Sequence, residues 1–314
     1  MFEECKIVID RLKLCYKNES RFWQVMSTMP ELIEVGDFEL RRSVPDGMYD
    51  GIYNVYHLQR EFGTLLFDRF SDKDRKFCWL SVRNHILYSD DLKTLINFQD
   101  EFEFGEVNNI TQLDIACDLD FNPVPRIKKL LKRDDVSVVR CGTKIDDKKQ
   151  EIEGLLFLHP TNSLRELAPT LCFTDNDRRK ILVVYDKIKE IKKSHKTYIA
   201  DYYGNPRRLY RMEIRLSSDE LFRYFKKYDV APALNMLLNQ SFIKSMYDEF
   251  LFRLIHISYK RKSIGMLDAI IAIKEGYDLE VVEGYNNNRQ QYSNHIPNNT
   301  NQCIKTDYVS IKSY

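Results

Sequence analysis

The sequence predicts an α/β fold of the α+β kind, in which helices cover one face of a central antiparallel sheet. Several segments alternate apolar and polar residues, which is typical of half-buried strands, and the clearest is LDIACDLDF (113–121). Apolar residues at helical spacing are concentrated after residue 217. A hydrophobic fraction of 43% with 30% charged residues describes an ordinary globular chain, and 314 residues allow about two domains.

The first hundred residues are expected to form mainly strands. The segment CKIVIDRLKLCY (5–16) alternates as a strand does, and GTLLFDRF (63–70) and RKFCWLSV (75–82) flank a short polar loop. Two such runs on either side of a short polar loop predict a β-hairpin. A short helix is expected over residues 92–99, followed by an acidic linker over 101–109.

The strand at 113–121 divides into two chemically different faces. Leu113 and Ile115 lie on one face, and Asp114 and Asp118 lie on the other, because successive side chains of a strand point to opposite sides. If helices cover the apolar face, the carboxylates lie on the opposite side of the sheet.

Further elements follow in order along the chain. A basic helix, RIKKLLKR (126–133), is expected after two prolines, and strands are expected over 136–143 and 154–158. Residues 170–193 predict a strand, a polar turn, a second strand and a basic exit. The segment RLYRMEIRL (208–216) alternates again and predicts one more strand.

Helices are expected in the last third of the chain. Ser217 and Glu220 are spaced as a capping box, which opens an amphipathic helix over 221–228. Residues 231–275 carry apolar positions that predict further helices. The Asn- and Gln-rich segment from residue 285 is nearly uncharged, and we expect it to be disordered.

The formal net charge of +1 conceals a strong asymmetry. Residues 1–120 hold 14 Lys and Arg against 23 Asp and Glu, which gives −9, and the remaining residues carry +10. Asymmetry of this kind indicates a nucleic-acid or other polyanionic partner for the basic part.

Several classes of protein are excluded by what the sequence lacks. No apolar run approaches the roughly 18–20 residues of a membrane-spanning helix, and the acidic start does not resemble a secretory signal. The seven cysteines form no CxxC pair, which favours free thiols in a reducing cytoplasm over a zinc site. The motifs GxGxxG, GxxxxGK[ST], HExxH and GxSxG are absent, and no two of the six histidines are spaced as HxH. Any metal must therefore be held by carboxylates.

Three polar features stand out, although each has an ordinary structural explanation. The aspartates on one strand face are typical of solvated carboxylates, and a tyrosine in VVYDK (183–187) is typical of a strand aromatic. Glu213 between Arg211 and Arg215 is typical of a surface ion-pair ladder, which contributes little to stability. Their occurrence together, in this order, favours a functional site.

In that order the sequence resembles a known family. The motifs LDIA (113–116), YDKIKE (185–190) and RMEIR (211–215) resemble those of the rolling-circle replication initiators, the nicking-joining proteins of filamentous phages (gene II-like) and of plasmids (Rep_trans-like). The opening IDRLKL (9–14) resembles the family's first strand, whereas Gln112 replaces the arginine that usually precedes the aspartate strand. The three motifs together, rather than any one of them, carry the resemblance.

The resemblance implies a Rep-like nicking domain related to the HUH nucleases but without their histidine pair. It also implies that Tyr185 is the nucleophile and that Asp114 and Glu213 are metal ligands on neighbouring strands. Chemistry agrees, because a tyrosine hydroxyl has an ordinary pKa of about 10 and needs a nearby metal or cation to attack a phosphate. Carboxylate oxygens select Mg²⁺ or Mn²⁺.

Two further residues are candidates near the nucleophile. Asp118 is a third potential metal ligand, but an ideal strand places it roughly 13 Å from Asp114, so it either approaches through a bulge or acts indirectly. Lys187 is expected on the same strand face as Tyr185, where it lowers the pKa of the tyrosine or holds the scissile phosphate. The alternative for Lys187 is a solvated charge.

A basic cluster surrounds the candidate nucleophile and predicts contacts with DNA phosphates. The predicted contacts are Arg178, Arg179, Lys180, Lys189, Arg211 and Arg215. Nearby tyrosines are candidates for base stacking, or one of them for a second nucleophile, although ordinary packing explains any single one. These tyrosines are Tyr198, Tyr202, Tyr203 and Tyr210.

The leading hypothesis is a metal-dependent replication initiator that nicks and rejoins one strand of origin DNA. Its parts are expected to be an N-terminal β-rich portion (1–108), a catalytic nicking core (109–225), a helical extension (226–284) and a disordered polar tail (285–314). Expected partners are single- and double-stranded origin DNA, a host helicase and polymerase, and a second copy of the chain, in the cytoplasm of a bacterial host and without a membrane. The alternatives are a conjugative relaxase with the same chemistry and an origin-binding initiator without catalysis.

Overall fold

The computed structural model describes most of the chain in eight segments. These are residues 5–17, 21–44, 49–68, 77–89, 93–104, 106–144, 171–174 and 179–284. The strand expected at 154–158, the tail expected from 285 and Arg178 lie outside the described residues. Within those segments, no helix is both long and apolar enough to cross a bilayer.

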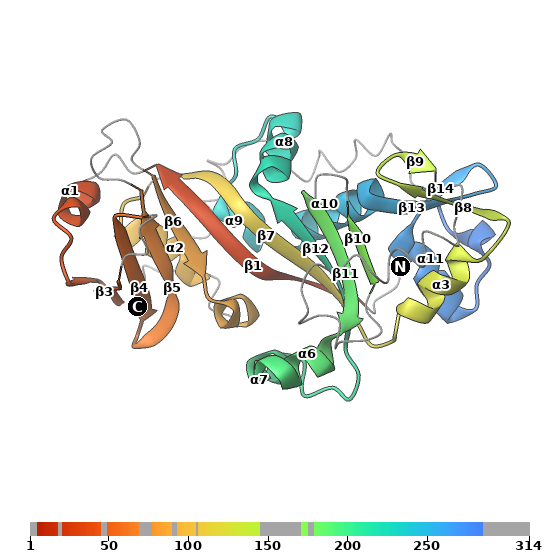
Figure 1. The fold of residues 1–314 in the computed structure, drawn as a ribbon, viewed down its shortest axis with the longest axis horizontal. Helices are drawn as coiled ribbons and strands as arrows, with labels where there is room; N and C mark the ends of the chain where they lie inside the picture. Colours follow the sequence, from red (N-terminus) through yellow and green to blue (C-terminus); the bar gives the residue numbers. More distant parts are fainter. Residues whose placement is uncertain are drawn as a thin grey trace, which may run out of the picture.

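A ten-stranded antiparallel sheet forms the body of the protein, as Figure 1 shows. Its strand order is β10-β11-β12-β7-β1-β6-β5-β4-β3-β2. The strands are β1 (Cys5–Lys17), β2 (Leu32–Val35), β3 (Phe38–Arg42), β4 (Gly51–His57), β5 (Arg60–Phe67), β6 (Phe77–Val82), β7 (Val107–Leu119), β10 (Leu171–Thr174), β11 (Lys180–Asp186) and β12 (Tyr210–Ser217). The predicted α/β class with a central antiparallel sheet is confirmed, and so is the hairpin of β5 and β6.

Helices and a second sheet complete the described fold. The second sheet has the order β14-β13-β8-β9. Its strands are β8 (Val136–Arg140), β9 (Thr143–Lys144), β13 (Ile255–Tyr259) and β14 (Lys262–Gly265). The helices are α1 (Arg21–Ser27), α2 (Thr94–Glu101), α3 (Val124–Leu131), α6 (Lys187–Ser194), α7 (Thr197–Tyr202), α8 (Ser218–Tyr228), α9 (Leu234–Leu238), α10 (Gln240–Leu254) and α11 (Met266–Glu275), with 3-10 turns η1 (Asn84–Tyr88) and η3 (Leu279–Val281). In Figure 1, α3 and α11 lie beside the second sheet.

The expectation of helices over 231–275 is wrong in the middle of that range. Residues 255–265 form the hairpin of β13 and β14. Ile255, Ile257 and Tyr259 are buried in alternation with polar residues, which is a strand pattern, and β13 pairs with β8 from more than a hundred residues earlier in the chain. The alternation covers only five residues, and the partner that stabilises the strand is remote in sequence.

The boundary expected after residue 108 falls inside a strand. β7 begins at Val107, and β1 lies between β6 and β7 in the middle of the sheet. The N-terminal portion and the expected nicking core therefore share one continuous sheet, and β1 borders the strands that carry the motifs.

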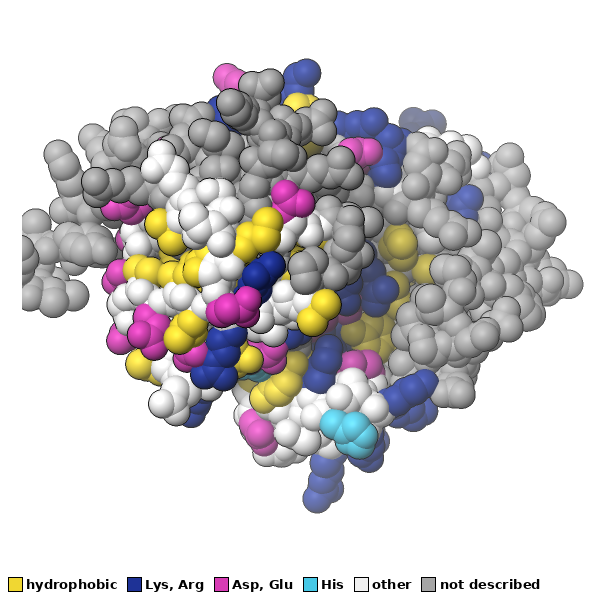
Figure 2. Space-filling view, turned by 60° about the vertical axis from the view of Figure 1, so that its left-hand side comes forward, with side chains coloured by type: hydrophobic (Ala, Val, Ile, Leu, Met, Phe, Trp, Pro, Cys, Tyr) yellow, Lys and Arg dark blue, Asp and Glu magenta, His cyan; other side chains and the backbone are white. Residues whose placement is uncertain are grey.

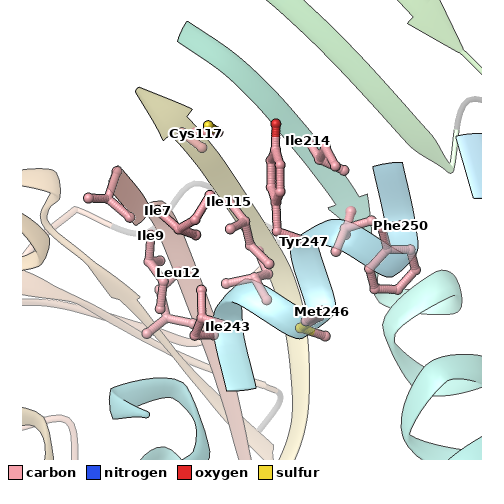
Figure 3. Close-up of a cluster of buried hydrophobic side chains, with 14 of the residues drawn as sticks. Ile7, Ile9, Leu12, Ile115, Cys117, Ile214, Ile243, Met246, Tyr247 and Phe250 are labelled. Atoms are coloured by element: carbon pink, nitrogen blue, oxygen red, sulfur yellow. The ribbon is translucent and has the colours of Figure 1, made fainter. Parts of the chain in front are cut away.

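Helix α10 covers one face of that sheet. It begins at a cap in which the Asn239 side chain accepts a hydrogen bond of 3.1 Å from the backbone nitrogen of Phe242. Figure 3 shows its side chains interdigitating with strand residues, and the Tyr247 hydroxyl donates a 3.1 Å hydrogen bond to the Met212 carbonyl of β12. The buried contact set is Ile7, Ile9, Leu12, Ile115, Cys117 and Ile214 from the strands, with Ile243, Met246, Tyr247 and Phe250 from α10. The polar residues of the same strands consequently lie on the opposite face.

Phe250→Ala tests how much the sheet depends on α10. Phe250 is fully buried, and removing such a ring should lower the free energy of unfolding by about 3–5 kcal/mol. The matched control is Phe222→Ala on α8, whose side chain is 58% exposed and whose loss should change stability by less than about 0.5 kcal/mol. Urea denaturation followed by circular dichroism measures both, and equal effects would contradict the packing described.

Candidate functional site

The strand register gathers the predicted polar residues on the face opposite α10. Arg211 of β12 pairs with Tyr185 of β11 on one side and with Asp118 of β7 on the other. Arg215 pairs with Asp114 four residues farther along β12, and Glu213 lies between the two arginines. All of these pairs share one face because side chains alternate along each strand.

Tyr185 lies at the end of β11, where the strand gives way to a helix. Asp186 is the N-cap of α6, and its carboxylate accepts a 3.0 Å hydrogen bond from the backbone nitrogen of Lys189. The tyrosine side chain is buried, and its hydroxyl donates a 2.6 Å hydrogen bond to Oε2 of Glu213. The YDKIKE motif thus encodes a strand end, a helix cap and the first turn of α6.

The proton of the Tyr185 hydroxyl points at an ionised acceptor. Burial and the neighbouring Glu213 carboxylate raise the pKa of Tyr185 well above its ordinary value. Burial and Asp10 also act to raise the pKa of Glu213, but Arg215 and Arg211 outweigh them and hold that pKa below its ordinary value. Arg215 does so at close range, since its Nε donates a 2.7 Å hydrogen bond to Oε1 of Glu213.

Asp114 lies on the same face, but its negative charge is less well compensated than that of Glu213. Burial, followed by the charge of Glu213, raises its pKa to about 7. Its Oδ2 lies 3.6 Å from Nε of Arg11, and its Oδ1 is buried without a hydrogen-bond partner in the described part of the chain. Two neighbouring carboxylates with an unsatisfied buried oxygen fit the donor preference of Mg²⁺ or Mn²⁺. The described residues contain no group of three or more His, Cys, Asp or Glu arranged to hold a metal.

Asp118 makes its hydrogen bonds with Arg211 and Tyr203, away from Asp114 and Glu213. Arg211 binds it through two hydrogen bonds, Nε to Oδ1 at 2.7 Å and Nη2 to Oδ2 at 2.5 Å. The Tyr203 hydroxyl donates a further 2.6 Å hydrogen bond to Oδ2. Asp118 therefore contacts an arginine and a tyrosine, and the sequence had left open whether this candidate ligand approaches Asp114 through a bulge or acts indirectly.

The DNA contact predicted for Arg211 conflicts with its position. Its side chain is fully buried, and besides Asp118 it binds the carboxylate of Asp10 and donates a 2.7 Å hydrogen bond to the Tyr88 hydroxyl. These partners take four of the five N–H donors of the guanidinium, and burial keeps the group away from a phosphate at the surface. The alternation within RMEIR (211–215) predicted the strand face on which Arg211 lies. It could not predict that this face is buried, because the covering groups come from β1 and η1.

Lys187 is the first residue of α6 rather than a strand residue on the face of Tyr185. Its side chain is only 1% exposed, which excludes the solvated charge considered from sequence. The ammonium lies 2.8 Å from Oε2 of Glu190, 3.7 Å from Oδ1 of Asp10 and 5.7 Å from the ring centre of Tyr185. Lys187 is therefore close to the candidate nucleophile, but it lies at the start of a helix and not on the strand face where it was expected.

The remaining basic candidates lie farther out. Lys189 is 54% exposed and Arg215 is 35% exposed, so both offer donors to a ligand at the surface. Lys180 instead forms a 3.0 Å ion pair with Glu220 of α8. The expected capping box does not form, because the Ser217 side chain makes no capping hydrogen bond and Glu220 is committed to Lys180.

The tyrosines considered for base stacking make contacts within the protein. The Tyr198 hydroxyl donates a 2.7 Å hydrogen bond to Asn84, and the Tyr202 ring meets Tyr88 edge-on at 5.4 Å. The ammonium of Lys6 lies 3.7 Å above the Tyr202 ring. Tyr210 opens β12 and is partly buried among apolar residues. These contacts fit ordinary packing of α7 against η1.

Sequence reasoning missed Asp10 and Tyr88, which complete the polar cluster. The signal for Asp10 was present as a change of alternation: Ile7 and Ile9 face α10, and so does Leu12, although it is an odd number of residues from Ile9. Such a change requires a β-bulge, and the register of β1 against β7 shows one there. No comparable signal marked Tyr88.

The protein surface around α6 and α7 is basic. Figure 2 shows Lys and Arg side chains gathered toward the lower edge of the molecule, around a histidine. Lys189, Lys192 and Lys193 of α6 and Arg207 and Arg208 after α7 are exposed. These cations lie on the elements that directly follow Tyr185.

Comparison with solved structures gives a structural likeness. A solved rolling circle replication initiator protein from Geobacillus stearothermophilus is similar over 80% of this chain and 86% of its own, with a TM-score of 0.40 and 15% sequence identity. No protein-family model and no curated protein sequence matches the chain.

Arg211→Lys tests the buried cluster. Lysine keeps the charge but cannot reach two carboxylates in a fork, so the variant should lose about 2–4 kcal/mol of unfolding free energy. The control Arg207→Lys makes the same change at an exposed position and should lie within about 0.5 kcal/mol of the parent. Chemical denaturation distinguishes them, and a stable Arg211→Lys protein would contradict the described network.

Asp114→Asn tests the strained carboxylate. The pKa of the Asp114 carboxyl is about 7 in the folded state, above its value in the unfolded chain, so the folded protein binds more protons. The free energy of unfolding therefore falls as the pH rises toward 7. The stability of Asp114→Asn relative to the parent should therefore increase by about 2–4 kcal/mol from acid to neutral pH and then level off. Denaturation at a series of pH values measures this.

The same variant tests metal binding without an activity assay. Added Mg²⁺ or Mn²⁺ should raise the melting temperature of the parent, because a ligand bound only by the folded state stabilises it. It should leave Asp114→Asn unmoved. An identical shift in both proteins would remove Asp114 from the metal site.

Proposed function

We propose that the chain is a replication initiator that nicks one DNA strand and later rejoins it through a covalent 5′-phosphotyrosine at Tyr185. The observation that carries the proposal is the 2.6 Å hydrogen bond from the Tyr185 hydroxyl to a carboxylate held ionised by arginines. A buried tyrosine aimed at an ionised base on the polar face of a sheet is arranged as an activated nucleophile.

The proposed nicking step conserves a phosphodiester bond. Tyr185 Oη attacks the scissile phosphorus while its proton passes to Glu213. The bond from phosphorus to the 3′ oxygen breaks, and that oxygen takes up a proton to become the 3′-hydroxyl that primes synthesis. In the reverse step a 3′-hydroxyl attacks the phosphotyrosine, and Tyr185 recovers its proton. No bond energy is lost in either direction, so the protein needs no nucleotide cofactor for joining.

Asp114 and Glu213 are the residues that would hold a divalent metal, Mg²⁺ or Mn²⁺. The support is the unsatisfied Oδ1 of Asp114 and the raised pKa of its carboxyl beside Glu213. When bound, such an ion supplies positive charge that stabilises a phosphate carrying extra negative charge. Arg215 contributes from the chain itself, since it binds Glu213 and is partly exposed.

The exposed cations of α6 and of the segment after α7 are the proposed contacts for the DNA backbone. They belong to the elements that continue from Tyr185, so a strand bound along them passes the nucleophile. Binding through such contacts falls steeply with salt concentration. Single- and double-stranded origin DNA, a host helicase and polymerase, and a second copy of the chain are the proposed partners in a bacterial cytoplasm.

A conjugative relaxase shares this chemistry and differs only in the fate of the nicked strand. An origin-binding protein without catalysis is the alternative from another class. The buried pair of Tyr185 and Glu213 favours catalysis, because pure DNA binding uses exposed donors rather than a tyrosine held against a carboxylate.

Tyr185→Phe tests the proposal. The variant removes one oxygen and keeps the ring, so we expect it to bind DNA normally and to form no covalent adduct. Parent and variant are incubated with a random-sequence single-stranded DNA library and Mg²⁺ or Mn²⁺, and SDS-resistant adducts are recovered and sequenced. The matched control is Tyr259→Phe in the second sheet, which should form the adduct at the parent's rate.

Two outcomes would overturn the proposed function. If the parent forms no adduct with any member of the library while binding it in a salt-sensitive manner, the chain is a non-catalytic initiator. If Tyr185→Phe forms as much adduct as the parent, another residue is the nucleophile.

A further inference from the structure

The N-terminal strand contributes one carboxylate to the polar face, and it does so through a β-bulge. In the register of β1 against β7, Ile9 pairs with Ile115 and Arg11 pairs with Asp114, so Asp10 is the extra residue. A bulge of this kind redirects a side chain and is common beside active sites. Both Asp10 and Arg11 thereby turn away from α10, which Ile9 contacts on the other face.

Asp10 meets three groups that surround Tyr185. Its carboxylate binds the Arg211 guanidinium, accepts a hydrogen bond from the Tyr88 hydroxyl and lies 3.7 Å from Nζ of Lys187. Its side chain is 13% exposed, so these contacts are largely shielded from water. Burial acts to raise the pKa of Asp10, but Arg211 and Lys187 hold that pKa well below its usual range.

The two cations that Asp10 holds come from two different elements next to Tyr185. Arg211 is its register partner on β12, and Lys187 lies two residues after it, with the ammonium 5.7 Å from the ring centre. Both cations are almost completely buried. Without Asp10, the ion pairs left to these cations in the described part of the chain would be Lys187 with Glu190 of its own helix and Arg211 with Asp118.

We propose that Asp10 is a positioning residue of the nicking reaction, which holds Lys187 and Arg211 beside Tyr185. This inference rests on the proposed function. Two fixed positive charges near the Tyr185 ring favour the step in which its phenolic oxygen carries negative charge, as leaving group in rejoining and as attacking group in nicking. Because the cations are placed before DNA arrives, no reorganisation is needed at the moment of reaction.

The two buried cations explain why a carboxylate is needed at this place, and the bulge explains how Asp10 reaches it. Two buried cations near one tyrosine repel each other and are unfavourable without a counter-charge. Asp10 reaches both from the one strand position that departs from alternation. A regular β1 strand would place residue 10 or residue 11 against α10 instead, and one of the two charges would then enter the hydrophobic core.

The experiment compares Asp10→Asn with Asp10→Glu in single-turnover adduct formation. The substrate is a single-stranded oligonucleotide selected by the parent protein from the random library. Asp10→Asn should slow adduct formation at saturating DNA by about 10- to 100-fold and change the DNA affinity by less than about threefold. Asp10→Glu keeps the charge and should restore most of the rate. The matched control is Asp37→Asn in the exposed turn between β2 and β3, which should not differ from the parent.

A double-mutant cycle separates positioning from a general loss of structure. If Asp10 acts through Lys187, adding Asp10→Asn to Lys187→Met should slow the reaction much less than Asp10→Asn slows the parent. Should Asp10→Asn fail to fold, the other two variants still test the pair: Lys187→Met must slow the reaction, and Asp10→Glu must keep most of the parent's rate.

Three results would overturn the role of Asp10: a folded Asp10→Asn protein that reacts at the parent's rate, effects of the two substitutions that multiply independently, or a loss confined to DNA affinity. Each of these leaves the adduct of the parent protein intact. Failure of the proposed function is different, because the parent itself then forms no adduct or Tyr185→Phe still forms one.

Discussion

The buried guanidinium of Arg211 is the interaction on which the rest of the site depends. It extends from β12, binds Asp118 of β7 in a two-pronged pair and reaches Asp10 of β1. It therefore joins three neighbouring strands on the face that α10 leaves open. A buried charge is tolerated only when it is paired and hydrogen-bonded, and the planar fork of arginine meets both conditions.

Around this centre, two neighbouring carboxylates acquire opposite properties. Glu213 receives the Arg215 Nε at 2.7 Å and stays ionised, whereas Asp114 has Arg11 at 3.6 Å from a side chain that is 57% exposed. A weakly held, water-screened cation compensates burial poorly, so the pKa of Asp114 rises to about 7. The placement of cations, rather than the type of acid, moves the pKa values of these two carboxyl groups in opposite directions.

Much of the architecture was predictable from local pattern. Alternation placed Asp114 and Asp118 on one face of a strand, and the order of the three motifs indicated neighbouring strands, as the pairing of β7, β12 and β11 shows. The helix at α3 and the hairpin of β5 and β6 were predicted for the same reason, because their periodicity is local. The hairpin of β13 and β14 escaped prediction because its stabilising partner, β8, is remote in sequence.

The sequence by itself determined the strands, the apolar face that meets α10 and the residue types available for chemistry, since these follow from the period of side chains along a strand. Tertiary structure alone decided which charges are buried. Arg211 changes from an apparent surface arginine to the fully enclosed centre of the cluster because β1 and η1 deliver Asp10 and Tyr88 to it. Lys187 becomes a buried neighbour of Tyr185 because Asp186 starts a helix there. Burial is a property of what lies across from a residue, and the chain supplies that from segments more than a hundred residues away.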